Sequence, residues 1–216
     1  QWMGYTATWA GIVTAPVGLL AIVLSPWVGK NVSRFDPRLL ATLAFLGFGL
    51  VLWLRAQFNV QAPLLTILLP TLLQGAAMAF FFIPLQAIVF SGLTPEQMPA
   101  ASGLSNFVRI TAGAVGTSVF TTLWEDRAVL HHAYLSEAVH RGNQAATQAL
   151  ALLTSAGQTP DQASATLNRL LDQQAYTLAV IDLFYASSGL FLALIGLVWL
   201  TQPRRLGTAA AGFRRP

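Results

Sequence analysis

Charged side chains are scarce in this chain. Only 8 acidic and 12 basic residues occur among 216, so Asp, Glu, Lys and Arg together make up 9%, against about 25% in an ordinary soluble domain. Hydrophobic residues supply 55%, and the mean hydropathy is +0.59. Because a soluble fold of this size needs charge to cover its surface, the composition excludes a typical cytosolic enzyme domain, a disordered chain and a nucleic-acid binder.

Cysteine is absent, which excludes a disulfide framework and a thiolate metal site. The HExxH, GxSxG, P-loop and GxGxxG signatures are also missing. His131 and His132 lie near acidic residues, but adjacent residues point about 100° apart on a helix and make a poor metal site. We therefore expect a protein that is not an enzyme and holds no metal.

The chain begins at Gln1 and shows no signal peptide, so we expect it to be part of a longer polypeptide. Its main feature is a series of long uncharged runs, since about 20 apolar residues of helix cross a bilayer core about 30 Å thick. The fold class that we predict is an all-α membrane protein with five transmembrane helices. The predicted spans lie at about 10–28, 39–55, 64–90, 100–124 and 178–200.

Lysine and arginine indicate how these spans are oriented. The short loop after the first span carries Lys30, Arg34 and Arg38, and the tail, residues 201–216, is basic. Five spans place this loop and this tail on one side, which we expect to be the cytoplasm. The long polar segment 125–177 then lies outside the cytoplasm, and the high pI needs no polyanionic partner.

Segment 125–177 carries helix signals of its own. Thr159, Pro160 and Gln162 match a capping box with proline at the first helical position, and Ala163, Leu167, Leu170 and Leu171 follow at helical spacing. We predict an extracytoplasmic helical loop. A mobile linker is the alternative.

The basic loop after the first span is the first candidate motif. Gly29 ends the predicted span, and Asp36 can pair with Arg34 or Arg38, which would pin two helix ends together. The alternative is an ordinary positive-inside loop.

The third predicted span contains two prolines. Proline removes a backbone donor, and membrane helices tolerate it where a neighbour or a cavity satisfies the freed carbonyl. Gln74 and Gln86 lie near Pro70 and Pro84, so these four residues are candidates for a substrate cavity. Filling of an irregular shape is the alternative.

Two charged residues lie inside predicted spans rather than at their ends. Arg109, about nine residues into its span, is a candidate structural or gating charge by default, unless its long side chain reaches back to the cytoplasmic surface. Asp182 is a candidate for proton binding, and an interfacial carboxylate exposed to water is the alternative. The two residues enter from opposite faces, so we do not expect them to form a pair.

Several stretches together resemble the drug:proton antiporters of the major facilitator superfamily, specifically the C-terminal portion of the 14-span EmrB type. The resemblance covers almost the whole chain. The stretches that carry it are 4–11 (GYTATWAG), 15–18 (APVG), 81–85 (FFIPL), 91–96 (SGLTPE), 104–109 (LSNFVR), 116–118, 124, 131–133 and 196–199.

This resemblance implies a C-terminal helix bundle whose N-terminal partner bundle, with the usual proton-coupling carboxylates, is missing. It implies export of hydrophobic drugs from the bacterial inner membrane by alternating access, with a proton gradient as the energy source and no cofactor. It also implies a periplasmic adaptor and a TolC-like outer-membrane channel as partners, besides membrane lipid. Leu167 and Leu170 are candidates for adaptor docking. A non-transporting membrane scaffold or partner subunit is the alternative function.

Overall fold

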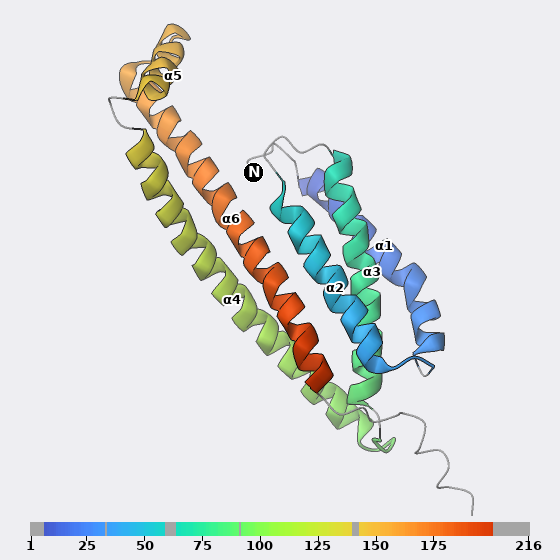
Figure 1. Cartoon of the computed structure of the whole chain (residues 1–216). Coiled ribbons are helices and arrows are strands. Elements are labelled where there is room, and N and C mark those ends of the chain that lie inside the picture. Colours follow the sequence, from blue (N-terminus) through green and yellow to red (C-terminus); the bar gives the residue numbers. More distant parts are fainter. Residues whose placement is uncertain (1–6, 33, 59–63, 91, 140–142, 201–216) are drawn as a thin grey trace, which may run out of the picture. The chain divides into compact units, whose positions relative to one another are not determined.

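The computed structural model describes residues 7–32, 34–58, 64–90, 92–139 and 143–200. All regular structure within these ranges is helical, and the all-α class is confirmed. The helices are α1 (Ala7–Asn31), α2 (Pro37–Ala56), α3 (Leu64–Val89), α4 (Met98–Ala138), α5 (Gln144–Ser155) and α6 (Pro160–Leu200). They form two compact units (Figure 1). The first unit holds α1, α2, α3, α4 up to Gly113 and α6 from Phe184, and the second holds Ala114–Leu183.

Four of the described helices contain stretches long and apolar enough to cross a bilayer: Gly11–Asn31, Arg38–Ala56, Ile67–Gln86 and Pro160–Leu200. The predicted fourth span, 100–124, is helical as part of α4 but is not among these four. Glycine, serine and threonine are frequent in this stretch and lower its hydropathy. Its crossing of the membrane therefore stays a prediction.

Because the chain has no cysteine, single cysteines can test this span directly. We expect Phe35→Cys to be labelled only from the cytoplasm and Ser155→Cys only from the other side, since three predicted spans separate them. Impermeant maleimide applied to intact cells and to inverted vesicles measures this. Labelling of both positions from one side would show that α4 does not cross.

Small residues on two sides of α3 let α1 and α2 approach it closely. α3 packs against both helices, and Figure 1 shows it between them. A Cβ atom built on Gly75 would clash with the carbonyl oxygen of Val17 in α1. On the opposite side of α3, a Cβ on Gly47 of α2 would lie 3.0 Å from the Cβ of Ala77. Residues 75 and 77 lie about 200° apart on a helix, so each serves a different neighbour.

The end of α6 joins the first unit through aromatic and polar contacts with α2. The rings of Phe48 and Phe191 stack with centroids 5.2 Å apart, and Phe81 of α3 meets Phe48 edge-on at 6.0 Å. The buried Ser188 hydroxyl donates to the Gly49 carbonyl at 2.8 Å. The contacts of α2 with α3 and α6 therefore include packed aromatic rings and one hydrogen-bonded hydroxyl group.

Hydroxyl groups within α1, α2 and α3 bond backward to their own helices. The Ser25, Thr42 and Thr71 hydroxyls donate to the carbonyls of Ala21, Arg38 and Ile67, four residues earlier in each case. These side chains satisfy their own polar groups and do not link these three helices to one another.

The second unit is a helical hairpin, and it confirms the predicted capping box. The Gln162 backbone N–H donates to Thr159 Oγ1 at 3.3 Å, and the Thr159 N–H donates to Gln162 Oε1 at 3.0 Å. α5 ends at Ser155, and Gly157 follows with a φ of +92°, a conformation that glycine adopts without strain. Of the helices in segment 125–177, α5 is separate, whereas α4 and α6 continue predicted spans, since each runs unbroken for 41 residues.

The basic loop after the first span differs from expectation at two positions. α1 continues through Gly29 to Asn31, so Gly29 does not end the helix. Asp36 is the N-cap of α2, because its carboxylate accepts from the Arg38 backbone N–H at 3.0 Å. Among the described residues no side-chain ion pair joins Asp36 to Arg34 or Arg38, so the predicted pairing is replaced by a backbone cap.

Candidate functional site

A pocket of about 420 Å³ lies in the first unit, where the end of α3 meets the beginning of α4. α4 lines it with Ser102, Ser105, Asn106 and Arg109, α3 lines it with Phe82 and Gln86, and Phe90 lines it directly after the end of α3. The α4 residues follow the i, i+3, i+4, i+7 spacing of one helix face, and the α3 residues are four apart. A polar face and an aromatic face therefore enclose the space between two helices.

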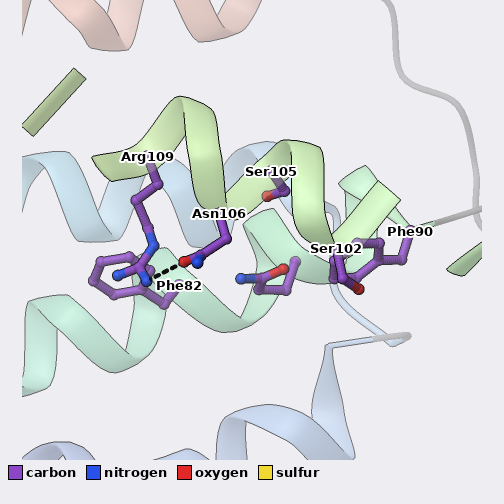
Figure 2. A pocket seen from close by; sticks show the side chains of 7 residues that line it. Phe82, Phe90, Ser102, Ser105, Asn106 and Arg109 are labelled. Carbon is purple, nitrogen blue, oxygen red and sulfur yellow. Dashed lines mark hydrogen bonds between the residues drawn. The ribbon is translucent and has the colours of Figure 1, made fainter. Parts of the chain in front are cut away.

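Arg109 is the only charged residue among those that line the pocket. It lies 11 residues from the start of α4, about 16 Å along the helix axis. Its Nη2 donates to Asn106 Oδ1 at 2.7 Å, and Figure 2 shows the side chain extending from α4 toward α3. Within the described part of the chain, no ion pair joins Arg109 to a carboxylate.

The four residues predicted to face a cavity have different surroundings. Gln86 lines the pocket. Pro70 and Pro84 are fully buried among neighbouring helices. The Gln74 amide oxygen accepts a 2.6 Å hydrogen bond from Arg55 Nη2 of α2, which satisfies one donor of a half-buried guanidinium. A role in a substrate cavity stays a prediction for all four.

The turn between α3 and α4 carries Glu96, which lies outside the pocket lining. Hydrogen bonds to the carboxylate from its own backbone and from the Thr94 side chain lower the pKa of Glu96. This turn therefore carries a negative charge at neutral pH, while the pocket lining carries a positive one.

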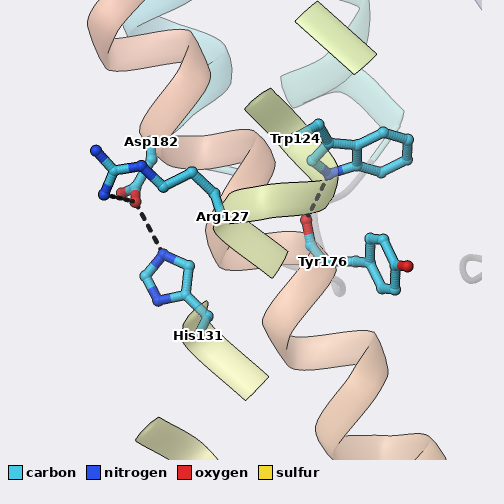
Figure 3. A network of polar contacts seen from close by, with 5 residues as sticks. All are labelled: Trp124, Arg127, His131, Tyr176 and Asp182. Carbon is cyan, nitrogen blue, oxygen red and sulfur yellow. Dashed lines mark hydrogen bonds and ion pairs between the residues drawn. The ribbon is translucent and has the colours of Figure 1, made fainter. Parts of the chain in front are cut away.

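A second polar cluster lies within the hairpin of α4 and α6 in the second unit. Asp182 Oδ2 is 2.8 Å from His131 Nε2 and 3.8 Å from Arg127 Nη1, and Figure 3 shows both side chains directed at the carboxylate. One turn away, the Trp124 indole N–H donates to the Tyr176 carbonyl at 3.1 Å. Asp182 thus contacts Arg127 and His131 of α4, and its proton binding stays a prediction.

The two neighbouring histidines point to different partners, as their helical spacing predicts. His131 contacts Asp182, whereas His132 Nε2 lies 3.4 Å from Asp172 Oδ1 and 3.4 Å from Asn168 Oδ1. Each histidine carries a charge only when protonated. The cluster therefore links α4 to α6 through contacts whose strength depends on histidine protonation.

The docking candidates lie on the hairpin helix α6. Ala163 of the predicted apolar stripe is buried, Leu167 is half-buried and Leu170 is 47% exposed. The stripe is therefore partly used by the hairpin itself, and its Leu170 end is accessible in the described structure.

The sequence pattern singled out Arg109 and Gln86 as candidates but gave no role to Asn106 or to the serines of the pocket. Ser102 and Ser105 share the helix face of Arg109, a spacing that is visible in the sequence. The partners of Asp182 were also missed, because they lie on another helix.

Comparisons with known proteins give several relatives. The chain is 41% identical over 201 residues to the multidrug export protein EmrB of Escherichia coli K12. This match covers 93% of this chain and 39% of EmrB. It is 37% identical over 201 residues to the fatty acid resistance protein FarB of Neisseria gonorrhoeae, covering 93% of this chain and 40% of FarB.

A third relative is the probable multidrug resistance protein EmrY of Escherichia coli K12, 34% identical over 209 residues. It too is matched over 93% of this chain and 40% of its own length. No protein-family model matches the chain, and no solved structure matches it. The chain thus spans about two fifths of the length of these relatives.

Proposed function

This chain is EmrB-like over nearly its whole length, and on that premise we propose that it forms the C-terminal part of a proton-driven multidrug exporter of the major facilitator superfamily. The observation that carries the proposal is the 41% identity to EmrB over 93% of the chain. In such a transporter, a cavity between two helix bundles opens alternately to each side of the membrane, and ligands shift the balance between the two states.

The membrane helices support this proposal through their composition. The described chain is multi-pass in character, with four apolar stretches long enough to span. We place it in the bacterial inner membrane with its C-terminus in the cytoplasm, following the positive charges of the first short loop and the tail. Hydrophobic compounds would reach the transporter from the lipid or the cytoplasm.

Proton coupling in this chain would involve Asp182. Asp182 is a carboxylate that can take up a proton, and its contact with His131 gives the pair protonation states of different charge. The remaining coupling carboxylates would belong to the N-terminal bundle of the same transporter.

An exchange experiment tests the function. The matching 201-residue segment of E. coli EmrB is replaced by this chain, and drug resistance is measured in cells that lack their own EmrB. We expect the exchanged protein to restore most of the resistance conferred by intact EmrB, because 41% of the residues are shared. A well-inserted exchange protein without any resistance would favour the scaffold alternative.

We also propose that the hairpin of the second unit docks a periplasmic adaptor, which in turn meets a TolC-like channel. Leu170→Asp, on the exposed end of the apolar stripe, is expected to reduce adaptor co-purification because a buried unpaired charge costs several kcal/mol. Leu167→Asp should act in the same direction, although part of its effect would be on the hairpin itself.

Leu152→Asp is the matched control, since Leu152 lies on α5 of the same unit and is 70% exposed. Drug binding by the solubilised transporter should be unchanged in Leu170→Asp. Full adaptor binding by Leu170→Asp, or an equal loss with Leu152→Asp, would contradict docking through this stripe.

A further inference from the structure

The pocket between α3 and α4 combines one unneutralised cation with uncharged donors and aromatic walls. A guanidinium has five N–H donors, and the one hydrogen bond from Arg109 to Asn106 leaves most of them available. Ser102 and Ser105 add hydroxyl groups on the same helix face. A cation within a membrane helix is costly without a counter-charge, so this arrangement favours an anion with several oxygen atoms.

The opposite wall of the pocket favours hydrocarbon. Phe82 lies on α3 and Phe90 directly follows its end, and Gln86, four residues from each, supplies an amide. A volume of about 420 Å³ is within the range of small-molecule sites and exceeds the volume of a single small ion. The ligand therefore has an apolar part beside its anionic group.

The surroundings of the pocket also favour an amphiphile. Leu104 and Phe107 flank the polar face of α4, and their side chains are 65% and 66% exposed. Where α4 crosses the bilayer, as the sequence predicts, such side chains can contact acyl chains. An entry path along this surface suits a molecule whose tail can remain in hydrocarbon while its head group enters the pocket.

We propose that this pocket binds an anionic head group carried on a hydrocarbon tail, with Arg109 holding the anion, Ser102, Ser105 and Gln86 donating to its oxygens, and Phe82 and Phe90 contacting the first part of the tail. Such a molecule can come from two sources. It is either an anionic phospholipid of the bilayer or an anionic amphiphile in transit, and only the second source rests on the proposed export function.

The test uses the purified full chain in a non-ionic detergent. Binding of phosphatidylglycerol is compared with binding of phosphatidylcholine by native mass spectrometry, and binding of dodecanoate is compared with binding of dodecyltrimethylammonium by calorimetry. We expect the protein to bind phosphatidylglycerol more tightly than phosphatidylcholine, or dodecanoate more tightly than dodecyltrimethylammonium, or both. We expect Arg109→Gln to weaken that binding at least about tenfold, since a hydrogen bond to a charged group is lost.

Two variants control this comparison. Lys30→Gln removes one cation from the exposed end of α1 and should leave binding unchanged. Arg109→Lys keeps the charge and should retain part of the binding, which separates loss of charge from misfolding when elution on size-exclusion chromatography is also compared. Phe82→Ala should weaken the binding of dodecanoate more than the binding of a short-chain carboxylate such as butyrate.

The outcomes distinguish the two sources of the ligand. They also distinguish failure of this binding proposal from failure of the proposed export function. Preference for phosphatidylglycerol alone assigns the site to bilayer lipid, preference for dodecanoate alone assigns it to a molecule in transit, and mutual displacement shows one site for both. Equal binding of anionic and other head groups, or unchanged binding in Arg109→Gln, would overturn the proposal. Because binding is measured without transport, failure of the exchange experiment leaves this result intact, and the reverse also holds.

Discussion

Gly75→Ala is expected to force α1 away from α3 and to lower the free energy of unfolding by about 3 kcal/mol, the upper part of the usual cost of overpacking. The new Cβ would clash with the Val17 carbonyl oxygen, and a backbone atom cannot move aside as the end of a flexible side chain can. Helix propensity acts in the opposite direction, because alanine favours a helix over glycine by about 1 kcal/mol. A loss of stability would therefore report the contact itself.

Gly18→Ala is the matched control for this change. Gly18 follows Val17 in α1, and a Cβ there would meet nothing within 4 Å. Gly47→Ala should be intermediate, since its Cβ would meet the Ala77 side chain at 3.0 Å. Thermal unfolding in detergent, followed by tryptophan fluorescence, ranks the three variants. Equal midpoints for Gly75→Ala and Gly18→Ala would show that α1 does not pack on α3 at this point.

Arg109→Ala is expected to reduce transport at least about tenfold while membrane insertion persists, because the pocket loses its only charged group. Removing a charge from a membrane helix lowers the insertion cost by about 2.5 kcal/mol, so weak activity could not be attributed to poor insertion. Arg109→Lys should recover only part of the activity, since an ammonium is a point charge on a flexible stem. Export of a hydrophobic drug by the exchanged EmrB, normalised to its amount in the membrane, measures this effect.

Lys30→Ala is the control for this second variant. Lys30 is an exposed cation at the end of α1 and lies outside the pocket lining. Asn106→Leu should reduce transport less than Arg109→Ala, because Asn106 positions the guanidinium through the 2.7 Å hydrogen bond. Transport at the level of the unaltered protein in Arg109→Ala would support the alternative that this side chain only reaches back to the membrane surface.

Local patterns explain which parts of the structure were predictable. The Thr159 capping box and the stop near Gly157 depend on residues within one turn, so the sequence reveals them. The apolar runs of α2 and α3 likewise gave bounds within a few residues of the observed ones. The prediction that Gly29 ends the first helix was wrong, because glycine is only weakly unfavourable in a helix. α1 continues past Gly29 for two further residues.

Contacts between helices were not predictable from the sequence. His131 and Asp182 are 51 positions apart, and their meeting depends on how far along α6 the helix α4 lies. Arg55 and Gln74 meet in the same way between α2 and α3. No periodicity within one helix encodes such a register, which is fixed by side-chain packing over the whole interface. The pocket was predictable only in part. The helical spacing of its α4 residues is visible in the sequence, but the aromatic residues on its opposite wall are not.

The backward-directed hydroxyls of Ser25, Thr42 and Thr71 have a mechanical consequence. Since each donates within its own helix, a sliding movement of α1, α2 or α3 along its axis breaks none of these three hydrogen bonds. Between α1 and α3, resistance to such shear includes the close packing of the Val17 backbone on Gly75. Between α2 and α3, the hydrogen bond from Arg55 to Gln74 adds a polar link that sliding would break. Sliding of α1 over α3 leaves the three backward-directed hydrogen bonds intact, which suits a protein that must change shape repeatedly.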